Sequence, residues 1–543
     1  MYLENRILEI EESPQLFQDY LYHFEKLSAF FQWDPRNDWE RCLQVRASAV
    51  EHRKTVGEVL RAQNRAWEAP PTVLDNIEKL TQPKSVAIVT GQQAGLFGGP
   101  LYTVYKIITV IKLARHLNRQ YPAWNFIPGF WMEVTDNDYG EINHIHLLTI
   151  GGELHTLHLP DAPRDYRSIY RREIPREMDS LFTSIMEITP ETEFREPVFS
   201  LMKTIYQPGR SFAVAFARWL LNNFGEYGLV VVNPADRKLA ELVRPLYHQA
   251  LTQCHVIASR VEETSRQLLE QGYHNQIQFS PGQTLLFCEG DDQGRYRLDR
   301  KSDRWILARP GKPIQMTNTD LLGLLENSPE RFTPNVALRP IVQDYLLPTA
   351  AYVAGPGEIS YAAQLKSLYQ FFGVTPPIFY PRIRATIVEK KINRLVQKFG
   401  LTYASIFQKR GKIIEDYRKV HTDQNLEKVF FQAENQISSS LKAIAEYLGE
   451  LDPTLIPPVK KTEDTMKTNL ARLKQKAEKA FESRLRTELD QLQKILTHLF
   501  PNNIYQERVF NILSYELKYG PDFIKAIYES TIHDSPGHQL LFI

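Results

Sequence analysis

The sequence SVAIVTGQQAGLFGGP occupies residues 85–100 and gives the strongest indication of the architecture of this chain. Its first six residues form a short β-branched run, which is typical of a buried strand. A glycine-rich turn follows, and then a helix over about 101–117 with a broad apolar face. The segment FIPGFWMEV at 126–134 is the next predicted strand. Strand, turn, helix and strand form a βαβ unit, which predicts a parallel sheet with a right-handed crossover.

A second helix and strand extend the predicted sheet. The helix is expected at 212–223 and the strand LVVVN at 229–233, and residues 284–288 and 378–380 are further strand candidates. The pattern therefore predicts an α/β fold class with a doubly wound parallel sheet as its core.

The remainder of the predicted N-terminal domain, residues 1–385, surrounds this core. Roughly the first 80 residues read as amphipathic helices. Mixed polar stretches at about 147–207 and 290–335 are predicted insertions between the elements of the core.

From Thr386 the helical period dominates and glycine becomes scarce. Apolar residues between Met466 and Leu499 recur mostly by alternating fours and threes, which is the heptad spacing of a coiled coil. An earlier apolar helix precedes it, and the turn LDPTLIPP at 451–458 joins the two. We therefore predict an α-helical coiled-coil arm over 386–500. Residues 501–543 are expected to pack back on the core.

The composition excludes several classes of protein. The 65 lysines and arginines balance the 64 acidic residues, so no global field attracts nucleic acid or an anionic membrane. The three cysteines lie far apart, which argues against a disulfide framework and a structural zinc site. Neither a signal peptide nor an apolar run long enough to span a bilayer is present. We expect a soluble, cytoplasmic protein with no nucleic-acid or membrane partner.

The glycine-rich turn is the first candidate for a binding site. Closely spaced glycines between a strand and a helix expose backbone N–H groups at a helix N-terminus, where anions are favoured. Gln92 and Gln93 add amide donors and acceptors there. The turn lacks the Gly-Lys-Ser/Thr ending of a phosphate loop and the GxGxxG spacing. An ordinary structural turn therefore remains an equal alternative.

The second candidate is the run EVTDNDYGEINH at 133–144, which directly follows the second predicted strand. Ligands of parallel sheets bind at the carboxyl ends of strands. Asp136 and Asp138 could hold a polar substrate, coordinate a metal or accept a proton from an amine, and His144 could also accept one. Helix capping by Asp138 together with Glu141 is the alternative for that aspartate. The nearby histidines match no strong metal signature.

The third candidate begins with RPIVQDYLLPTAAYVAGPGEISY at 339–361. Glu358, Tyr361 and Gln364 have helical spacing on one face. Arg339 and Arg382 are candidate clamps for a carboxylate or phosphate, because a guanidinium can bind either group through two hydrogen bonds. A structural salt bridge is an equal alternative for both arginines.

Taken together, these stretches resemble the bacillithiol biosynthesis cysteine-adding enzymes, the BshC family. The matching segments are 90–106 (TGQQAGLFGGPLYTVYK), 138–144, 339–365, 381–389 (PRIRATIVE) and 506–513 (QERVFNIL). The resemblance implies a Rossmann-like core related to nucleotidylyltransferases and class I aminoacyl-tRNA synthetases. It also implies connecting insertions and homodimerisation through the coiled-coil arm.

The function implied by the resemblance is that of a ligase, which joins the carboxyl group of cysteine to the amine of glucosamine-malate. The chain departs from the expected family pattern at Asn137, where a histidine is expected between two acidic residues. A free carboxylate does not condense with an amine in water, so it must first be activated. An adenylate formed from ATP with Mg is the hypothesis, with the glycine turn holding phosphate.

The resemblance and the motifs together give a set of candidate site residues. Asp138 or His144 is the candidate base, and Arg339 or Arg382 would hold the carboxylates of malate. No metal ligand is predicted within the chain. The candidate catalytic residues are Asp136, Asp138 and His144, and the candidate binding residues are Gln92, Gln93, Gly95, Gly99, Tyr102, Lys106, Asn143, Arg339, Gln343, Glu358, Tyr361, Gln364 and Arg382.

Two alternatives remain open on sequence alone. The first is a nucleotidylyltransferase-like enzyme that acts on another small molecule. The second is a catalytically inactive coiled-coil scaffold, which the departure at Asn137 favours.

Overall fold

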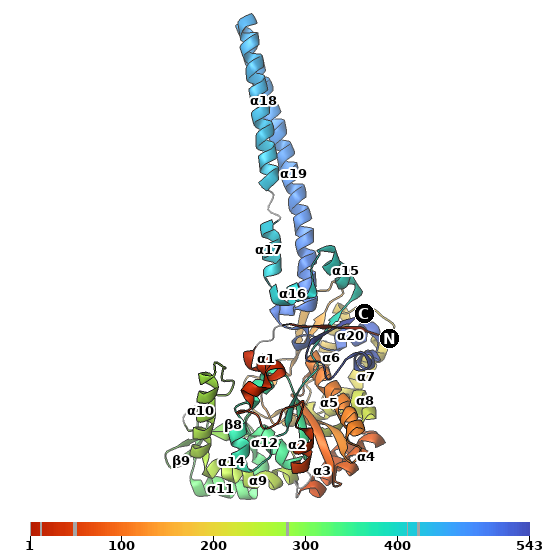
Figure 1. Cartoon of the computed structure of the whole chain (residues 1–543), viewed down its shortest axis with the longest axis vertical. Coiled ribbons are helices and arrows are strands. Elements are labelled where there is room, and N and C mark those ends of the chain that lie inside the picture. The colour runs from red at the N-terminus through yellow and green to blue at the C-terminus, as the bar shows by residue number, and fades with distance from the viewer. Residues whose placement is uncertain (1, 11–13, 47–51, 279–281, 410, 421–423) are drawn as a thin grey trace. The chain divides into compact units, whose positions relative to one another are not determined.

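The computed structural model describes residues 2–10, 14–46, 52–278, 282–409, 411–420 and 424–543 (Figure 1). These residues form two compact units. Unit 1 consists of Met1–Val388 and Ile504–Ile543, and the arm consists of Glu389–Asn503. Among the helices in the described ranges, none combines the length and the apolar character needed to cross a bilayer.

Unit 1 is built around a five-stranded sheet whose neighbouring strands are all parallel. The strand order is β13-β12-β2-β3-β6. Read from β6 and numbered along the chain, this order is 3-2-1-4-5, which is the doubly wound arrangement. The predicted fold class is therefore confirmed. The strands are β2 (Ser85–Gln92), β3 (Asn125–Met132), β6 (Val230–Val232), β12 (Thr349–Ala354) and β13 (Ile378–Pro381).

The predicted βαβ unit forms the centre of this sheet. β2 is buried along its length except at Gln92, because both faces of the sheet are covered. It extends beyond the predicted run, since Gly91 and Gln92 still pair with β3. Helix α5 (Leu101–Gln120) then leads back to the start of β3, and it begins directly after Pro100. Buried residues occur all around α5, so this helix is enclosed rather than amphipathic.

The strand predicted at 284–288 lies outside the parallel sheet. It is part of β7 (Gln283–Glu289), which pairs with antiparallel neighbours in a second sheet of order β10-β9-β8-β7-β11. Its hairpin connection to β8 explains the difference, because a short turn can only join antiparallel strands. The other strands are β8 (Arg295–Lys301), β9 (Arg304–Leu307), β10 (Ile314–Met316) and β11 (Phe332–Pro334).

A third sheet joins segments from both ends of unit 1. Its order is β1-β15-β14, with β1 (Glu4–Leu8) antiparallel and β14 (Ala385–Val388) parallel to β15 (His538–Phe542). The purely helical prediction for the N-terminal region is therefore wrong at β1. The helices that follow are α1 (Gln15–Tyr22), α2 (Trp39–Arg46), α3 (Arg53–Ala66) and α4 (Pro71–Leu80).

The remaining elements of unit 1 cover the sheets. The hairpin β4–β5 begins the stretch that was predicted as the first insertion. These elements are β4 (His144–Leu148), β5 (Leu154–His158), α6 (Met178–Ile188), α7 (Arg195–Ile205), α8 (Phe212–Phe224), α9 (Arg237–Thr252), α10 (Cys254–Glu270), α11 (Asn318–Asn327), α12 (Arg339–Leu346), α13 (Pro356–Ala362), α14 (Lys366–Phe372), α20 (Leu513–Tyr519) and α21 (Phe523–Ser530).

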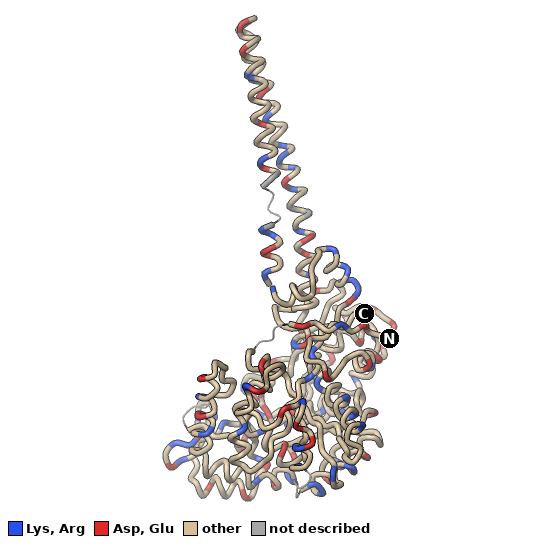
Figure 2. Tube along the Cα trace, in the orientation of Figure 1, with Lys and Arg blue, Asp and Glu red and all other residues tan. Residues whose placement is uncertain are grey.

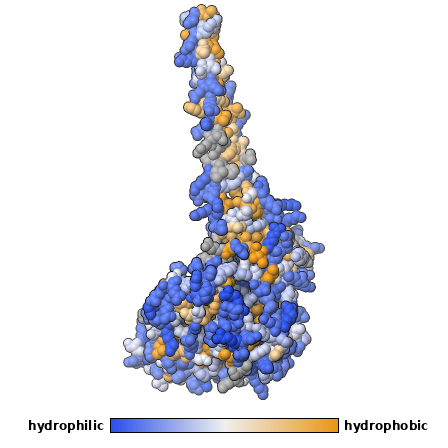
Figure 3. All heavy atoms as spheres, viewed as in Figure 1, coloured by the Kyte–Doolittle hydropathy of each residue, from blue (hydrophilic) through white to orange (hydrophobic). Residues whose placement is uncertain are grey.

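The arm is a helical hairpin. Two long helices, α18 (Gln424–Leu451) and α19 (Ile456–Leu499), are joined by the short turn at Pro453–Leu455. Basic and acidic residues are interspersed along both helices (Figure 2). Large hydrophobic side chains are also exposed along them, among the hydrophilic ones (Figure 3). The shorter helices of the arm are α15 (Lys390–Lys398), α16 (Tyr403–Lys409) and α17 (Lys412–Val420).

Candidate active site

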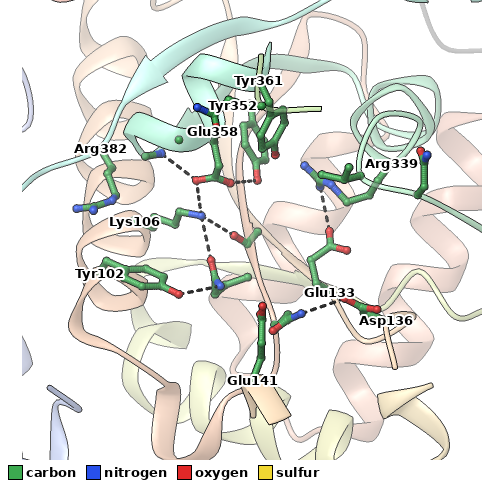
Figure 4. Close-up of a pocket in the computed structure, with 18 of the residues that line it drawn as sticks. Tyr102, Lys106, Glu133, Asp136, Glu141, Arg339, Tyr352, Glu358, Tyr361 and Arg382 are labelled. Carbon is green, nitrogen blue, oxygen red and sulfur yellow. Dashed lines mark hydrogen bonds and ion pairs between the residues drawn. The ribbon is translucent and has the colours of Figure 1, made fainter. Parts of the chain in front are cut away.

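A cavity of about 470 Å³ opens at the carboxyl ends of β2 and β12 (Figure 4). Gly91, Gln92 and Gln93 line it from the end of β2, and the turn at 355–358 lines it after β12. The strand order of the sheet reverses between these two strands. Open α/β sheets bind ligands at this switch point, because the loops on either side diverge there and leave a crevice.

The cavity is strongly charged. Cationic side chains outnumber carboxylates by five to four, so the lining favours anionic ligands. The cations are Lys106, Arg295, Arg339, Arg382 and Arg508, and the carboxylates are Glu133, Asp136, Glu141 and Glu358.

Lys106, which is buried, and Glu358, which is half-buried, form an ion pair across the switch point. Lys106 Nζ lies 2.6 Å from Glu358 Oε2 and also donates to the carbonyl of Gly91 and to Gln92 Oε1. Glu358 also accepts the Tyr352 hydroxyl at 2.9 Å and the Gly355 N–H at 2.8 Å. Burial alone would raise the pKa of Glu358, but Lys106 and these donors together lower it. Glu358 is therefore a fixed negative charge.

Glu133 directly follows β3 and differs from Glu358 in its electrostatic setting. Its Oε1 lies 3.1 Å from Arg339 Nη1, yet that oxygen accepts no well-aligned hydrogen bond from the described residues. Burial raises the pKa of Glu133, Arg339 partly offsets this rise, and Asp136 adds to it. A half-buried carboxylate with a raised pKa, whose Oε1 accepts no well-aligned hydrogen bond, has the properties of a general base.

The two arginines that were predicted as clamps already have carboxylate partners. Arg339 pairs with Glu133 and donates to Gln343 Oε1 at 3.1 Å. Arg382 Nη2 lies 2.5 Å from Glu507 Oε1, and both side chains are buried. The salt-bridge alternative is thus observed for both arginines. Each guanidinium still lines the cavity.

Arg508 is the cation of the lining without a carboxylate partner among the described residues. Its side chain is exposed and lies over the ring of Tyr102, 5.9 Å from the ring centroid. Burial raises the pKa of Tyr102 to about 12, so this phenol stays neutral. Arg508 and Tyr102 together offer donors to an anionic ligand.

The three predicted catalytic residues do not meet in the cavity. Asp136 lines it, where Oδ1 pairs with Arg295 at 3.0 Å and Oδ2 accepts from Gln93 at 3.0 Å. Asp138 is exposed outside the lining, and its side chain makes no capping hydrogen bond. His144 lies on β4, where its ring contacts two other histidines and Nδ1 is 2.9 Å from the carbonyl of Gly140. Asp138 and His144 are therefore poorly placed to act as the base.

The predicted binding residues divide in the same way. Gln92, Gln93, Tyr102, Lys106, Arg339, Glu358, Tyr361 and Arg382 line the cavity. Gln343 accepts a hydrogen bond from Arg339. The side-chain amide of Gln364 accepts a hydrogen bond from the N–H of Ile277 and donates one to the carbonyl of the same residue. Asn143 is buried and donates to Asp161. These three residues, with Gly95 and Gly99, lie outside the lining.

The glycine-rich turn has its own structural explanation. A Cβ on Gly95 would lie 2.9 Å from the Cα of Gly99, so the two glycines pack against each other. The N–H groups of Gly95, Leu96, Gly99 and Leu101 all donate to carbonyls within the protein. The expected phosphate cradle therefore has no free donors at these four positions.

Four charged residues of the lining were not among the candidate site residues: Glu133, Glu141, Arg295 and Arg508. The signal for Glu133 was its position at the carboxyl end of a predicted strand. Arg295 comes from β8 of the antiparallel sheet and Arg508 from the QERVFNIL segment, and neither is near the core strands in sequence.

Comparison with known proteins gives consistent results over nearly the whole chain. Residues 3–383 match the family model "Bacillithiol biosynthesis BshC, N-terminal Rossmann-like domain", and residues 385–543 match its C-terminal coiled-coil domain. A protein of Salinibacter ruber is 33% identical over 97% of this chain and 96% of its own length. One of Geobacillus sp. is 30% identical over all of both chains. Both carry the name "Putative cysteine ligase BshC".

Proposed function

The chain belongs to the bacillithiol biosynthesis BshC family, and we propose that it is a cytoplasmic ligase that joins the carboxyl group of cysteine to the amine of glucosamine-malate. The observation that carries the proposal is the charged cavity at the switch point, which both Glu133 and Arg508 line. The three cysteines of the chain are free thiols, which fits a reducing compartment.

Amide formation needs an activated acyl group and a deprotonated amine. We propose that ATP, bound with Mg, supplies the activation, so that the cysteine carboxylate displaces pyrophosphate and forms an acyl adenylate. The glucosamine amine then attacks the acyl carbon, the C–N bond forms and AMP leaves. The amine loses its proton to Glu133, which is the lining carboxylate with a raised pKa beside Arg339.

Glucosamine-malate carries two carboxylates, and a cation without an internal partner is best suited to bind one of them. Arg508 meets this requirement, whereas Arg339 and Arg382 are held by Glu133 and Glu507. We therefore assign the malate carboxylate to Arg508, with Tyr102 as the neighbouring donor.

Replacing Arg508 with methionine should raise the KM for glucosamine-malate by about 10- to 100-fold and change kcat less, because a hydrogen bond to a charged group is lost. Steady-state kinetics with the purified full-length chain measures this effect. Arg115→Met is the control, since Arg115 also contacts tyrosine rings but lies on α5 outside the cavity. Equal KM values in the two variants would remove Arg508 from the proposal.

The function itself is tested by incubating the protein with glucosamine-malate, cysteine, ATP and Mg, and by searching for bacillithiol by mass. Omission of ATP should abolish the product. If no product forms and glucosamine-malate also fails to raise the Tm, the inactive-scaffold alternative is favoured, because a ligand of the folded state must stabilise it. Stabilisation without product would favour another small-molecule reaction.

We also propose that the arm mediates a homodimer. Val429, Tyr447 and Leu451 on α18 are large hydrophobic residues that are more than half exposed. Tyr447 and Leu451 follow Val429 by about five and six helical turns, so the three lie on one side of the helix, where exposed apolar side chains are costly in water. Sedimentation equilibrium of the full chain should give twice the monomer mass, and Tyr447→Glu should shift the equilibrium toward the monomer. A monomer for the unsubstituted chain would contradict the proposal.

A further inference from the structure

A second cavity, of about 190 Å³, shares a wall with the first one. Thr135, Pro334 and Arg339 line both cavities. The second cavity lies at the carboxyl ends of β3 and β6, where Trp131 and the segment 234–236 line it, and helix α9 closes one side. Two ligands bound in the two cavities would therefore be immediate neighbours.

The size and the walls of the second cavity restrict its ligand. Its lining is mostly aromatic and aliphatic, with Trp131, Leu239, Val243, Tyr247, Val342 and Leu346 among its members. Pockets for drug-sized ligands usually measure about 300–1,000 Å³, so this one is too small for a nucleotide or a sugar acid. It fits a small molecule with an uncharged, weakly polar portion.

The charges of this lining leave one carboxylate without compensation. Its three arginines are paired, Arg171 with Glu289, Arg237 with Glu241 and Arg339 with Glu133. Asp236 accepts the N–H groups of Lys238 and Leu239 as the N-cap of α9.

Glu330 differs from these residues. It forms no ion pair within the described part of the chain, and its Oε2 is buried without a hydrogen-bond partner. An unpaired carboxylate in an apolar wall destabilises the protein unless a cation compensates it. An ammonium group on the ligand would supply this cation.

We infer that the second cavity binds the amino-acid substrate, with its ammonium group at Glu330, its side chain against Trp131 and Val243, and its carboxylate at the wall beside Arg339. The class of ligand, a small α-amino acid with an uncharged side chain, follows from the cavity. Its identity as cysteine rests on the proposed function.

This arrangement also solves a chemical problem of the proposed reaction. The amine of cysteine is itself a nucleophile and would compete with the amine of glucosamine-malate. An ion pair with Glu330 keeps the cysteine amine protonated and directs it away from the first cavity. The carboxylate at the shared wall is then presented to the amine on the other side.

The charge of Glu330 can be tested by calorimetric titration of the full-length protein. Cysteine should bind Glu330→Gln about 10- to 100-fold more weakly than the unsubstituted chain, because the charged partner of its ammonium is lost. 3-Mercaptopropionate lacks the ammonium group and should bind both proteins equally. Glu326→Gln is the matched control, since Glu326 pairs with Arg244 outside the cavity. Equal cysteine affinity in Glu330→Gln and the unsubstituted chain would overturn the inference.

A second variant tests the volume of the second cavity instead of the charge of Glu330. Val243→Phe should fill the cavity and abolish measurable cysteine binding, while the stabilisation of the protein by glucosamine-malate is retained. Unchanged cysteine binding would also overturn the inference. Failure of the proposed function has a different signature, because these titrations do not depend on product. If both variants lose cysteine binding but the unsubstituted protein forms no bacillithiol in the assay, the ligase proposal is wrong and the amino-acid site is still supported.

Discussion

Replacing Glu133 with glutamine is expected to lower the rate of amide formation by about 100- to 10,000-fold, which is the range for loss of a general base. Glutamine keeps the size of the side chain and its contact with Arg339 but cannot accept a proton. The KM for glucosamine-malate should change little, since Glu133 acts on the amine and Arg508 on the malate. Single-turnover measurements of bacillithiol formation, with an excess of enzyme, isolate the affected step.

The pH dependence provides an independent readout of the same role. A base acts in its deprotonated form, and burial raises the pKa of Glu133 above its ordinary value of 4.5. The rate of the unsubstituted enzyme should therefore rise with pH through this raised pKa. The rate of Glu133→Gln should show no such rise over the same pH range.

Asp138→Asn separates the two assignments of the base. Asp138 is exposed outside the cavity, so this variant should form product at the unsubstituted rate. If Asp138→Asn loses activity while Glu133→Gln retains it, the sequence-based assignment is correct and the assignment from the structure is wrong.

Replacing Glu507 with alanine is expected to lower the free energy of unfolding by about 3–5 kcal/mol, because it leaves the buried Arg382 charge without its carboxylate partner. The side chains of Arg382 and Glu507 are only 3% and 5% exposed. Glu507 also accepts the N–H of Ala385 at 3.0 Å, so β14 loses an anchor as well. Urea unfolding of the full-length protein measures the change.

Two further measurements identify the cause of this loss. In the double variant Arg382→Met and Glu507→Leu, no charge is left unpaired, so most of the stability should return.

Burial alone would raise the pKa of Glu507, but Arg382 lowers it. The stability from this pair is therefore present above the ordinary pKa of 4.5 and lost as the pH falls through the lowered value. A loss below about 1 kcal/mol in Glu507→Ala would place the pair among weak surface bridges.

The pair also explains why Arg508 reaches the cavity. Gln506 exchanges hydrogen bonds with the backbone of Ile387, and Glu507 binds Arg382. The next side chain, that of Arg508, is directed to the first cavity.

The central architecture could be predicted because it depends on short-range patterns. The β-branched run at 85–90 and the apolar helix after the glycine turn identify β2 and α5 without tertiary information. β12 was not predicted, because TAAYVA is rich in alanine and has little β-branched character. Its burial between β2 and β13 determines its conformation instead.

The site was predictable only in part. Lys106, Glu358 and the glutamines lie next to strand ends, and the switch point brings them together. Sequence could not distinguish Asp136 from Asp138, because the difference depends on which side of one turn faces the cavity. It could not find Arg295 or Glu330 either, since both come from parts of the chain outside the parallel sheet.

The position of β15 between β1 and β14 has a consequence for protein synthesis. β1 is translated long before β15, the strand with which it pairs. Arg508 and Glu507 also emerge late, so a nascent chain cannot present a finished cavity. Translation that stops before residue 504 would therefore release chains that lack Arg508, which lines the first cavity, and Glu507, which binds Arg382.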